Sequence, residues 1–258
     1  MDSEFLGLLR DPLSGAPLEL VREDRREFLA GPDGRRYPVE SGIVRFLAGR
    51  ELDGNNRRYR RLYDRLAPFY DLSTWLYARV KRLSVAERIG QYLGELEVGA
   101  SRSVIEISVG TGRNLVALPP AAAFYGVDIS MGMLKRCTRA MKRVGRSVSL
   151  VEAEAENLPF RDEAFDIVFS AGGFNFFNDR GRAVREMLRI AKRGTKLLIS
   201  DETEKIRARF DKGPVTKKFY GGQAAIAPAG AFLPPECLDI AYREVCDGEL
   251  YALTFRKP

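Results

Sequence analysis

A glycine-rich turn follows an apolar strand pattern near the middle of the chain. Val104-Ile105-Glu106-Ile107 runs into Ser108-Val109-Gly110-Thr111-Gly112, and a helical pattern begins directly afterwards. Such a turn, between the carboxyl end of a strand and the amino end of a helix, lets a ligand approach free backbone N–H groups. The dinucleotide fingerprint G-x-G-x-x-G is not met, because Arg113 and Leu115 occupy the third-glycine positions of its two frames. Hydride transfer with a nicotinamide cofactor is therefore disfavoured.

Two carboxylates follow this turn at ordered spacing. Asp128 ends the next strand pattern, 16 residues after Gly112, and Glu154 follows the third strand pattern. Taken singly, Asp128 could cap the helix that starts near Ser130, and Glu154 could be a solvated loop charge. The carboxyl ends of parallel strands meet at one edge of a sheet, where ligands bind and where a carboxylate can accept both hydroxyls of a ribose. The joint spacing favours such a site.

The chain has 258 residues and no histidine. This excludes a Ser-His-Asp triad, a Cys-His pair and a His-ligated metal, so catalysis must use carboxylates, hydroxyls, backbone dipoles or a cofactor. The three cysteines form no C-x-x-C pair, which indicates a reducing compartment and no metal site. The start, Met1-Asp2-Ser3-Glu4, lacks the apolar stretch of a signal peptide. We expect a cytoplasmic protein.

Three regions differ in their patterns. Residues 1–50 hold short β runs separated by Gly and Pro, residues 51–98 are helical and charged, with 53–56 as a linker, and residues 99–258 alternate strands with helices. This alternation predicts an α/β fold with a doubly wound parallel sheet. Asp247-Gly248 lies between two strand patterns and predicts a terminal hairpin. The predicted domains are thus a β module, a helical lid or linker, and the main domain.

The chain carries a net charge of +7, which invites a nucleic-acid or membrane partner. The excess is spread over both halves of the sequence, and there is no basic tail. One cluster is a run of six basic residues over 135–146 that contains no acid. Phosphates or an anionic membrane could meet this run, but a solvated helix face is the simpler interpretation. We therefore expect no clear nucleic-acid or membrane partner, and the sequence leaves the oligomeric state unknown.

The ordered motifs resemble one family. Glu106-x-Ser108-x-Gly110-Thr111-Gly112, Gly126-Val127-Asp128-Ile129-Ser130, Ala153–Phe160 and Phe165-Asp166-Ile167-Val168 look like successive motifs of the class I S-adenosylmethionine-dependent methyltransferases. The branch of the ubiquinone/menaquinone C-methyltransferases is the most similar, and Tyr63–Asp71 resembles its lid helix. The resemblance covers about 57–258. It implies a Rossmann-like, mostly parallel seven-stranded sheet that ends in a reversed hairpin.

The resemblance also implies a cofactor and its contacts. The cofactor is S-adenosyl-L-methionine, with S-adenosyl-L-homocysteine as the product and no metal. The residues implied to bind it are Tyr63, Tyr70, Glu106, Gly110, Gly112, Asp128, Ile129, Glu154, Ala155, Ser170 and Ala171. Among them, Asp128 binds the ribose hydroxyls and Glu154 accepts from the adenine amino group. Two positions depart from the family, because Ser108 stands where glycine is usual and Glu154 where aspartate is commoner.

Methyl transfer from a sulfonium is an in-line displacement that depends on orientation and on exclusion of water. Candidates for a proton acceptor, where one is needed, are Tyr63, Asp201 and Glu202, and candidates for the acceptor pocket are Phe174, Asn175 and Phe176. An aromatic stripe such as 174–177 is also typical of an ordinary core. An acceptor that is already electron-rich needs the least help, so we expect a small quinone-like or aromatic molecule. Two alternatives stay open: an RNA or protein methyltransferase that uses the basic clusters, and a non-catalytic cofactor-binding protein of the same fold.

The first 50 residues resemble the small zinc-ribbon-like module that precedes some bacterial methyltransferases. The similarity rests on Leu8–Leu18 and on Tyr37-Pro38-Val39-x-x-Gly42-Ile43. The cysteines of that module are missing, and Asp11 and Ser14 stand near the place of the first pair. Without cysteines the module cannot bind zinc in the same way. We expect a metal-free module that docks a partner or covers one side of the enzyme.

Overall fold

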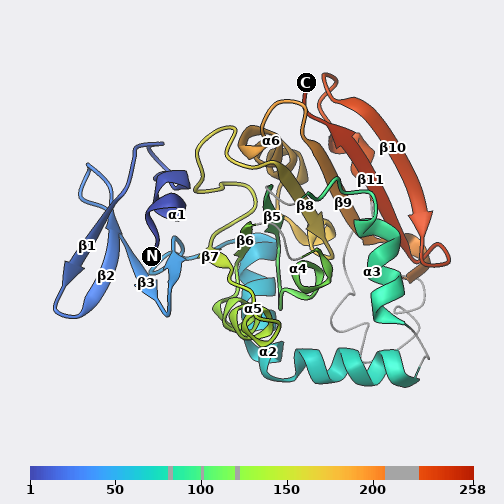
Figure 1. Cartoon of the computed structure of the whole chain (residues 1–258), viewed down its shortest axis with the longest axis horizontal. Helices are drawn as coiled ribbons and strands as arrows, with labels where there is room; N and C mark the ends of the chain where they lie inside the picture. Colours follow the sequence, from blue (N-terminus) through green and yellow to red (C-terminus); the bar gives the residue numbers. More distant parts are fainter. Residues whose placement is uncertain (81–83, 100–101, 120–122, 207–226) are drawn as a thin grey trace.

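A single sheet of eleven strands organises the protein, in the order β1-β2-β3-β4-β7-β6-β5-β8-β9-β11-β10. The structure is a computed structural model that describes residues 1–80, 84–99, 102–119, 123–206 and 227–258 (Figure 1). The strands are β1 (Glu19–Glu23), β2 (Arg26–Ala30), β3 (Arg36–Glu40), β4 (Ile43–Arg45), β5 (Ser103–Ile107), β6 (Ala123–Asp128), β7 (Ser149–Glu152), β8 (Ile167–Ala171), β9 (Lys196–Glu202), β10 (Leu238–Val245) and β11 (Leu250–Arg256). The helices are α1 (Ser3–Leu8), α2 (Gly54–Val80), α3 (Val85–Leu93), α4 (Arg113–Ala117), α5 (Met131–Arg143) and α6 (Arg180–Ile190), with short 3₁₀ turns η1 (Phe174–Phe176) and η2 (Ala229–Phe232).

The seven strands from β5 to β11 confirm the predicted fold class. Strands β5 to β9 pair in parallel, β11 runs antiparallel to β9, and β10 closes the reversed hairpin. Both faces of the central strands β5 to β9 are largely buried. One face packs with α1 and α6, and the other packs with α3, α4 and α5. This doubly covered arrangement explains why the central strands are apolar on both sides.

The N-terminal β module continues the same sheet. Strands β1 to β4 form an antiparallel meander, and β4 pairs in parallel with β7, with Val44 opposite Val151. A second contact joins Leu9 to Phe160 by an isolated bridge. In Figure 1 the module extends the sheet beyond β7, at the end opposite β10. The module therefore covers the edge that β7 would otherwise expose.

A buried carboxylate organises the turn that follows α1. Asp11 is fully buried, and its Oδ1 accepts from the backbone N–H groups of Leu13 and Ser14 at 2.7 and 2.8 Å. Its Oδ2 accepts from the Tyr37 hydroxyl at 2.8 Å. These hydrogen bonds lower the pKa of the Asp11 carboxyl despite its burial. Hydrogen bonds to a carboxylate thus hold this turn in shape.

The predicted linker was wrong. Most of residues 53–56 are instead the start of α2, because Asn178 Oδ1 accepts from the backbone N–H of Asn55 at 2.7 Å and so caps the helix from a distant part of the chain. Helix α2 continues through Pro68 to Val80. Strand β8 begins at Ile167, and Phe165 before it pairs with Ala191 in an isolated bridge.

Candidate active site

A cavity lies at the carboxyl ends of the parallel strands, between the strand ends and helix α2. The turns that follow β5, β6, β7 and β8 all contribute to its wall. Of the predicted cofactor residues, those that line it are Tyr63, Tyr70, Gly110, Asp128, Ile129, Ala155 and Ala171, and of the predicted acceptor-pocket residues, Phe176 does so. The structure therefore brings together residues from four strand ends and one helix.

Asp128 is the carboxylate of the cavity wall. Its side chain is 7% exposed, and its two oxygens accept from the backbone N–H groups of Gly110 at 2.8 Å and Ser130 at 2.9 Å. Burial raises the pKa of Asp128 to about 6, against the effect of these hydrogen bonds and with a smaller contribution from nearby Asp64. A carboxylate has about four acceptor positions, so Asp128 can still accept hydrogen bonds from a ligand.

Beneath the glycine-rich turn, a buried chain of polar groups ends in an unpaired oxygen. The Tyr92 hydroxyl donates to Asn114 Oδ1 at 2.8 Å, and Asn114 Nδ2 donates to Glu106 Oε1 at 2.6 Å. Glu106 is fully buried, and its Oε2 has no hydrogen-bond partner among the described residues. Burial raises the pKa of the Glu106 carboxyl well above its ordinary value. Tyr92 and Asn114 line the cavity, so this chain connects Glu106 to it.

Aromatic side chains form the opposite wall. Tyr59 packs against Phe176 with ring centroids 4.6 Å apart, and Tyr63 lies 6.1 Å from Tyr59 and 6.2 Å from Tyr70. Three of these rings come from α2, at the helical spacing that the sequence showed, and Phe176 comes from η1. Planar ligands pack well against such rings.

Helix α2 is fastened to the sheet at three points along its length. Near its start, Asn56 Nδ2 donates to Glu154 Oε1 at 2.9 Å. One turn later, Arg60 donates to Glu152 Oε1 at 2.8 Å. Further along, Asp64 Oδ1 accepts from the Ser130 hydroxyl at 2.6 Å. These contacts hold the aromatic wall over the cavity.

Glu152 joins three separate parts of the chain. It is fully buried at the end of β7, and besides Arg60 of α2 it accepts from Arg45 of β4 at 2.9 Å. Replacing Glu152 by glutamine leaves both guanidinium groups without this carboxylate. We expect a loss of about 3 kcal/mol in the free energy of unfolding, as for other broken buried ion pairs.

Urea denaturation measures this loss. The matched control is Glu40→Gln, because Glu40 also pairs with Arg45, at 2.6 Å, but its side chain is 46% exposed. The control is expected to lose less than about 1 kcal/mol. Equal losses in the two variants would contradict the assignment of Glu152 as the buried joint.

Other predicted residues lie next to the cavity but do not line it. Gly112 has φ +77°, and an added Cβ would lie 2.5 Å from the Cys137 sulfur, so this glycine permits close packing on α5. Glu154 accepts from Asn56, as described above. Ser170 is fully buried in β8, and its hydroxyl has no partner among the described residues.

The predicted catalytic carboxylates lie behind the η1 turn. Asp201 is 1% exposed, and its Oδ2 accepts from the backbone N–H of Asn175 at 2.8 Å. Burial raises the pKa of Asp201 to about 6, and burial together with Asp201 and Glu249 raises that of Glu202 to about 7. Phe174 is fully buried, as an ordinary core residue would be. None of these side chains lines the cavity, so Tyr63 is the predicted proton acceptor that does.

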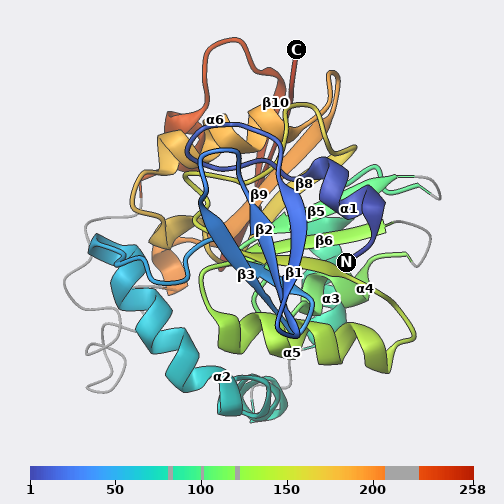
Figure 2. The same ribbon diagram turned by 90° about the vertical axis from the view of Figure 1, so that its left-hand side faces the viewer.

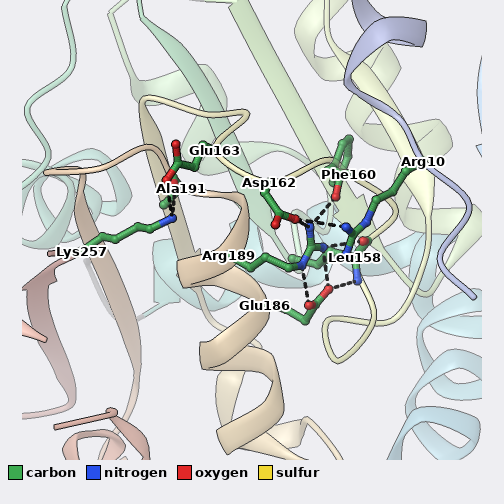
Figure 3. A network of polar contacts seen from close by, with 9 residues as sticks. All are labelled: Arg10, Leu158, Phe160, Asp162, Glu163, Glu186, Arg189, Ala191 and Lys257. Carbon is green, nitrogen blue, oxygen red and sulfur yellow. Dashed lines mark hydrogen bonds and ion pairs between the residues drawn. The ribbon is translucent and has the colours of Figure 1, made fainter. Parts of the chain in front are cut away.

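The loop after β7, which supplies Ala155, is fixed by Arg189 of α6 (Figure 3). Arg189 makes a two-point contact with Glu186 at 2.7 and 2.8 Å, and it donates to the backbone carbonyls of Leu158 and Phe160 at 2.9 and 2.6 Å. Arg189 and Arg10 of the N-terminal module both pair with Asp162. These hydrogen bonds and ion pairs hold the loop that carries Ala155, which is the predicted adenine side of the site.

Sequence reasoning missed several lining residues, of which Asn56, Tyr92 and Asn114 are examples. Asn114 directly follows the glycine-rich turn, so its place in the first helical turn after a ligand-binding loop was the available signal. Asn56 lay in the predicted linker, and its role depends on the distant Asn178. Among the described residues, no group of three or more His, Cys, Asp or Glu side chains could hold a metal ion.

Comparisons with known proteins place this fold. Residues 105–199 match the family described as "Methyltransferase domain". A demethylmenaquinone methyltransferase of Thermotoga maritima is 32% identical over 174 residues, which are 66% of this chain and 69% of that protein. A ubiquinone/menaquinone biosynthesis C-methyltransferase of Syntrophotalea carbinolica is 31% identical over 54% of this chain and 59% of its own length. A solved S-adenosylmethionine-dependent methyltransferase of Thermotoga maritima superposes with a TM-score of 0.58 at 22% identity, over 77% of this chain and 99% of that chain.

The fold and the strand-end cavity define a Rossmann-like methyltransferase. The chain belongs to the class I S-adenosylmethionine-dependent methyltransferase family. Its similarity in sequence extends to the demethylmenaquinone and ubiquinone/menaquinone methyltransferases, of which it spans 69% and 59% of the length in the two cases above.

The residues present fit S-adenosylmethionine. Within the described part of the chain, one buried carboxylate oxygen of Glu106 has no partner, and Asn114 joins Glu106 to the cavity; Asp128 brings a second carboxylate to the wall. Two carboxylates favour a ligand that carries positive charge, as the ammonium and sulfonium groups of the cofactor do. The aromatic wall can exclude water from the same space.

Proposed function

We propose that this protein transfers a methyl group from S-adenosylmethionine to a small aromatic acceptor of the quinol class. The bound cofactor supplies an activated methyl group on a sulfonium. The observation that carries the proposal is the pairing of Tyr59 and Phe176, with ring centroids 4.6 Å apart in the cavity wall. The names of the two quinone-pathway relatives support the same acceptor class.

The titratable groups of the cavity favour an acceptor that needs little activation. Among the described lining residues, Asp128 is the only carboxylate, and two backbone N–H groups already donate to it. A ring carbon of a hydroquinone is made electron-rich by its own oxygens, so it can accept the methyl group as the carbon–sulfur bond breaks and S-adenosyl-L-homocysteine leaves. The ring proton is then lost to water, a step that needs no strong base because it restores aromaticity. In this proposal Asp128 and Glu106 hold the cofactor, while Tyr59, Tyr63 and Phe176 orient the acceptor and exclude water.

The test is a methyl-transfer assay with purified protein, followed by mass spectrometry. The panel contains a demethylated menaquinol, a simple hydroquinone, an aliphatic amine, bulk RNA and a mixture of proteins, each with S-adenosylmethionine. We expect a gain of one methyl group on the quinols and none on the amine. Methylation of RNA or protein in place of the quinols would overturn the acceptor. If calorimetry showed cofactor binding but none of the candidate acceptors gained a methyl group, the result would support a non-catalytic binding protein instead.

A further inference from the structure

The net charge of the chain is concentrated on two helices. Helices α2 and α5 contain eleven Lys and Arg residues and two Asp residues, which gives a formal charge of +9. The whole chain carries +7, so the remaining residues sum to −2. The positive charge is therefore spread along the sequence but concentrated on two helices of the structure.

The two helices lie side by side. Asp64 of α2 accepts from Ser130 and from the backbone N–H of Gly132 at the start of α5, and Arg136 donates to the Pro68 carbonyl. The views of Figures 1 and 2 differ by a quarter turn about the vertical, and α2 and α5 lie along the lower edge of the molecule in both. Their charges therefore belong to one surface, which we call the α2–α5 surface.

Helix α5 turns its basic side outward. Its buried residues Met131, Leu134, Cys137 and Met141 belong to the core on this face of the sheet, and Met133 lines the cavity. Its exposed basic residues are Lys135, Arg139, Lys142 and Arg143. Helix α2 adds exposed Arg61 and Arg65.

Large apolar side chains are exposed among these charges. On α2, Phe69 is 66% exposed, Leu76 is 52% exposed and Leu66 is 37% exposed. At about 100° per residue, Phe69 and Leu76 lie on the side of α2 that carries Arg61 and Arg65, whereas Tyr59 and Tyr63 face the cavity. A purely solvated face does not call for an exposed phenylalanine and leucine beside six basic residues.

We propose that the α2–α5 surface binds an anionic lipid bilayer. Basic residues are attracted to anionic headgroups, and Phe and Leu side chains insert at the boundary of the acyl chains, which is the combination that this surface presents. RNA would use the charges but not the aliphatic side chains. None of the described helices is long and apolar enough to cross a membrane.

Docking in this way would place α2, and with it one wall of the cavity, against the bilayer. An apolar acceptor dissolved in the bilayer could then reach the cavity without crossing bulk water. The docking itself does not depend on the proposed function, because lipid binding is measured without S-adenosylmethionine or an acceptor.

The experiment is co-sedimentation of the full chain with vesicles. One set contains phosphatidylcholine and phosphatidylglycerol, and the other contains phosphatidylcholine alone. We expect binding to the anionic set and its loss at high salt. Arg139→Gln with Lys142→Gln should weaken binding by about fivefold for each charge removed. Phe69→Ser should weaken it by about tenfold, because its ring no longer leaves water.

Matched controls carry the same changes elsewhere. Arg25→Gln with Arg26→Gln removes two exposed charges from the β1–β2 turn, and Leu238→Ser removes an apolar side chain that is 51% exposed on β10. These variants should bind vesicles as the unaltered protein does. The proposal would be overturned if the control variants lost binding equally, or if the protein did not prefer the anionic vesicles. It would also be overturned if the protein ignored vesicles and bound RNA with an affinity that Phe69→Ser did not change.

Discussion

Replacing Asp128 by alanine is expected to weaken the binding of S-adenosylmethionine by about tenfold or more, as the loss of charge-assisted hydrogen bonds predicts. Asp128 is the lining carboxylate at the end of β6, and the resemblance to the family assigns it to the ribose hydroxyls. Isothermal calorimetry with the cofactor and with S-adenosylhomocysteine measures the change. An unchanged affinity would refute the assignment.

The control must separate ligand contact from loop structure, since Asp128 also accepts from the backbone of Gly110 and Ser130. Asp64→Ala is suited to this, because Asp64 accepts from the Ser130 hydroxyl in the same region but does not line the cavity. We expect Asp64→Ala to retain most of the affinity. A loss as large as that of Asp128→Ala would mean that the order of this loop, and not a ligand contact, sets the affinity.

The same carboxyl predicts a pH dependence. Burial raises the pKa of Asp128 to about 6, so the group takes up a proton as the pH falls through 6. A protonated carboxyl has fewer acceptor positions, and two are already used by the backbone N–H groups of Gly110 and Ser130, so only the carboxylate can also accept from both ribose hydroxyls. Cofactor affinity should therefore be constant above about pH 7 and fall by roughly tenfold per pH unit well below 6. An asparagine at position 128 cannot ionise. The Asp128→Asn variant should therefore bind the cofactor more weakly, with an affinity that does not change as the pH passes through 6.

Local signals allowed the sequence to predict the cofactor side of the cavity. Gly110 and Ala155 each lie three residues beyond the end of a strand, and Asp128 is the last residue of one, so a parallel sheet brings them to the same edge. The alternation of strand and helix patterns predicted the parallel sheet, whereas its seven strands were implied by the resemblance to the family. Turns and hydrophobic periodicity depend only on residues close together in the sequence, so they can be predicted from the sequence.

The unpredicted features depend on partners distant in sequence. Asn178 caps α2 from more than a hundred residues away, and Glu152 connects two arginines from separate elements. The pairing of β4 with β7 was also unpredicted, because a short strand such as Ile43–Arg45 does not indicate its partner. Asp201 and Glu202 were chosen for their chemistry, but strand β9 and the η1 turn place them behind the cavity wall.

One departure from the family pattern has a structural counterpart. Ser108 stands where glycine is usual and adopts φ +66°, a conformation that is unfavourable for a side chain. Directly opposite, Gly173 has φ −144°, and a Cβ added there would lie 2.1 Å from the Ser108 Oγ and 2.5 Å from the Ser108 Cβ. The serine side chain thus occupies the space that Gly173 leaves free.

Gly173→Ala is therefore expected to force the turns after β5 and β8 apart, since neither backbone nor Cβ can rotate out of the way. The free energy of unfolding should fall by about 2 kcal/mol, as overpacking of a close contact predicts. Cofactor affinity should fall by about tenfold or more, because both turns line the cavity. Denaturation and calorimetry measure the two effects.

The double variant Ser108→Gly with Gly173→Ala tests the cause. Glycine at 108 removes the clash and also tolerates the positive φ, so Ser108→Gly alone should change stability by less than about 1 kcal/mol. In the double variant, stability and affinity should return close to those of Ser108→Gly alone, which is a strong positive coupling between neighbouring residues. If Gly173→Ala is as damaging with glycine at 108 as with serine, then the 108–173 contact is not what fixes the two turns.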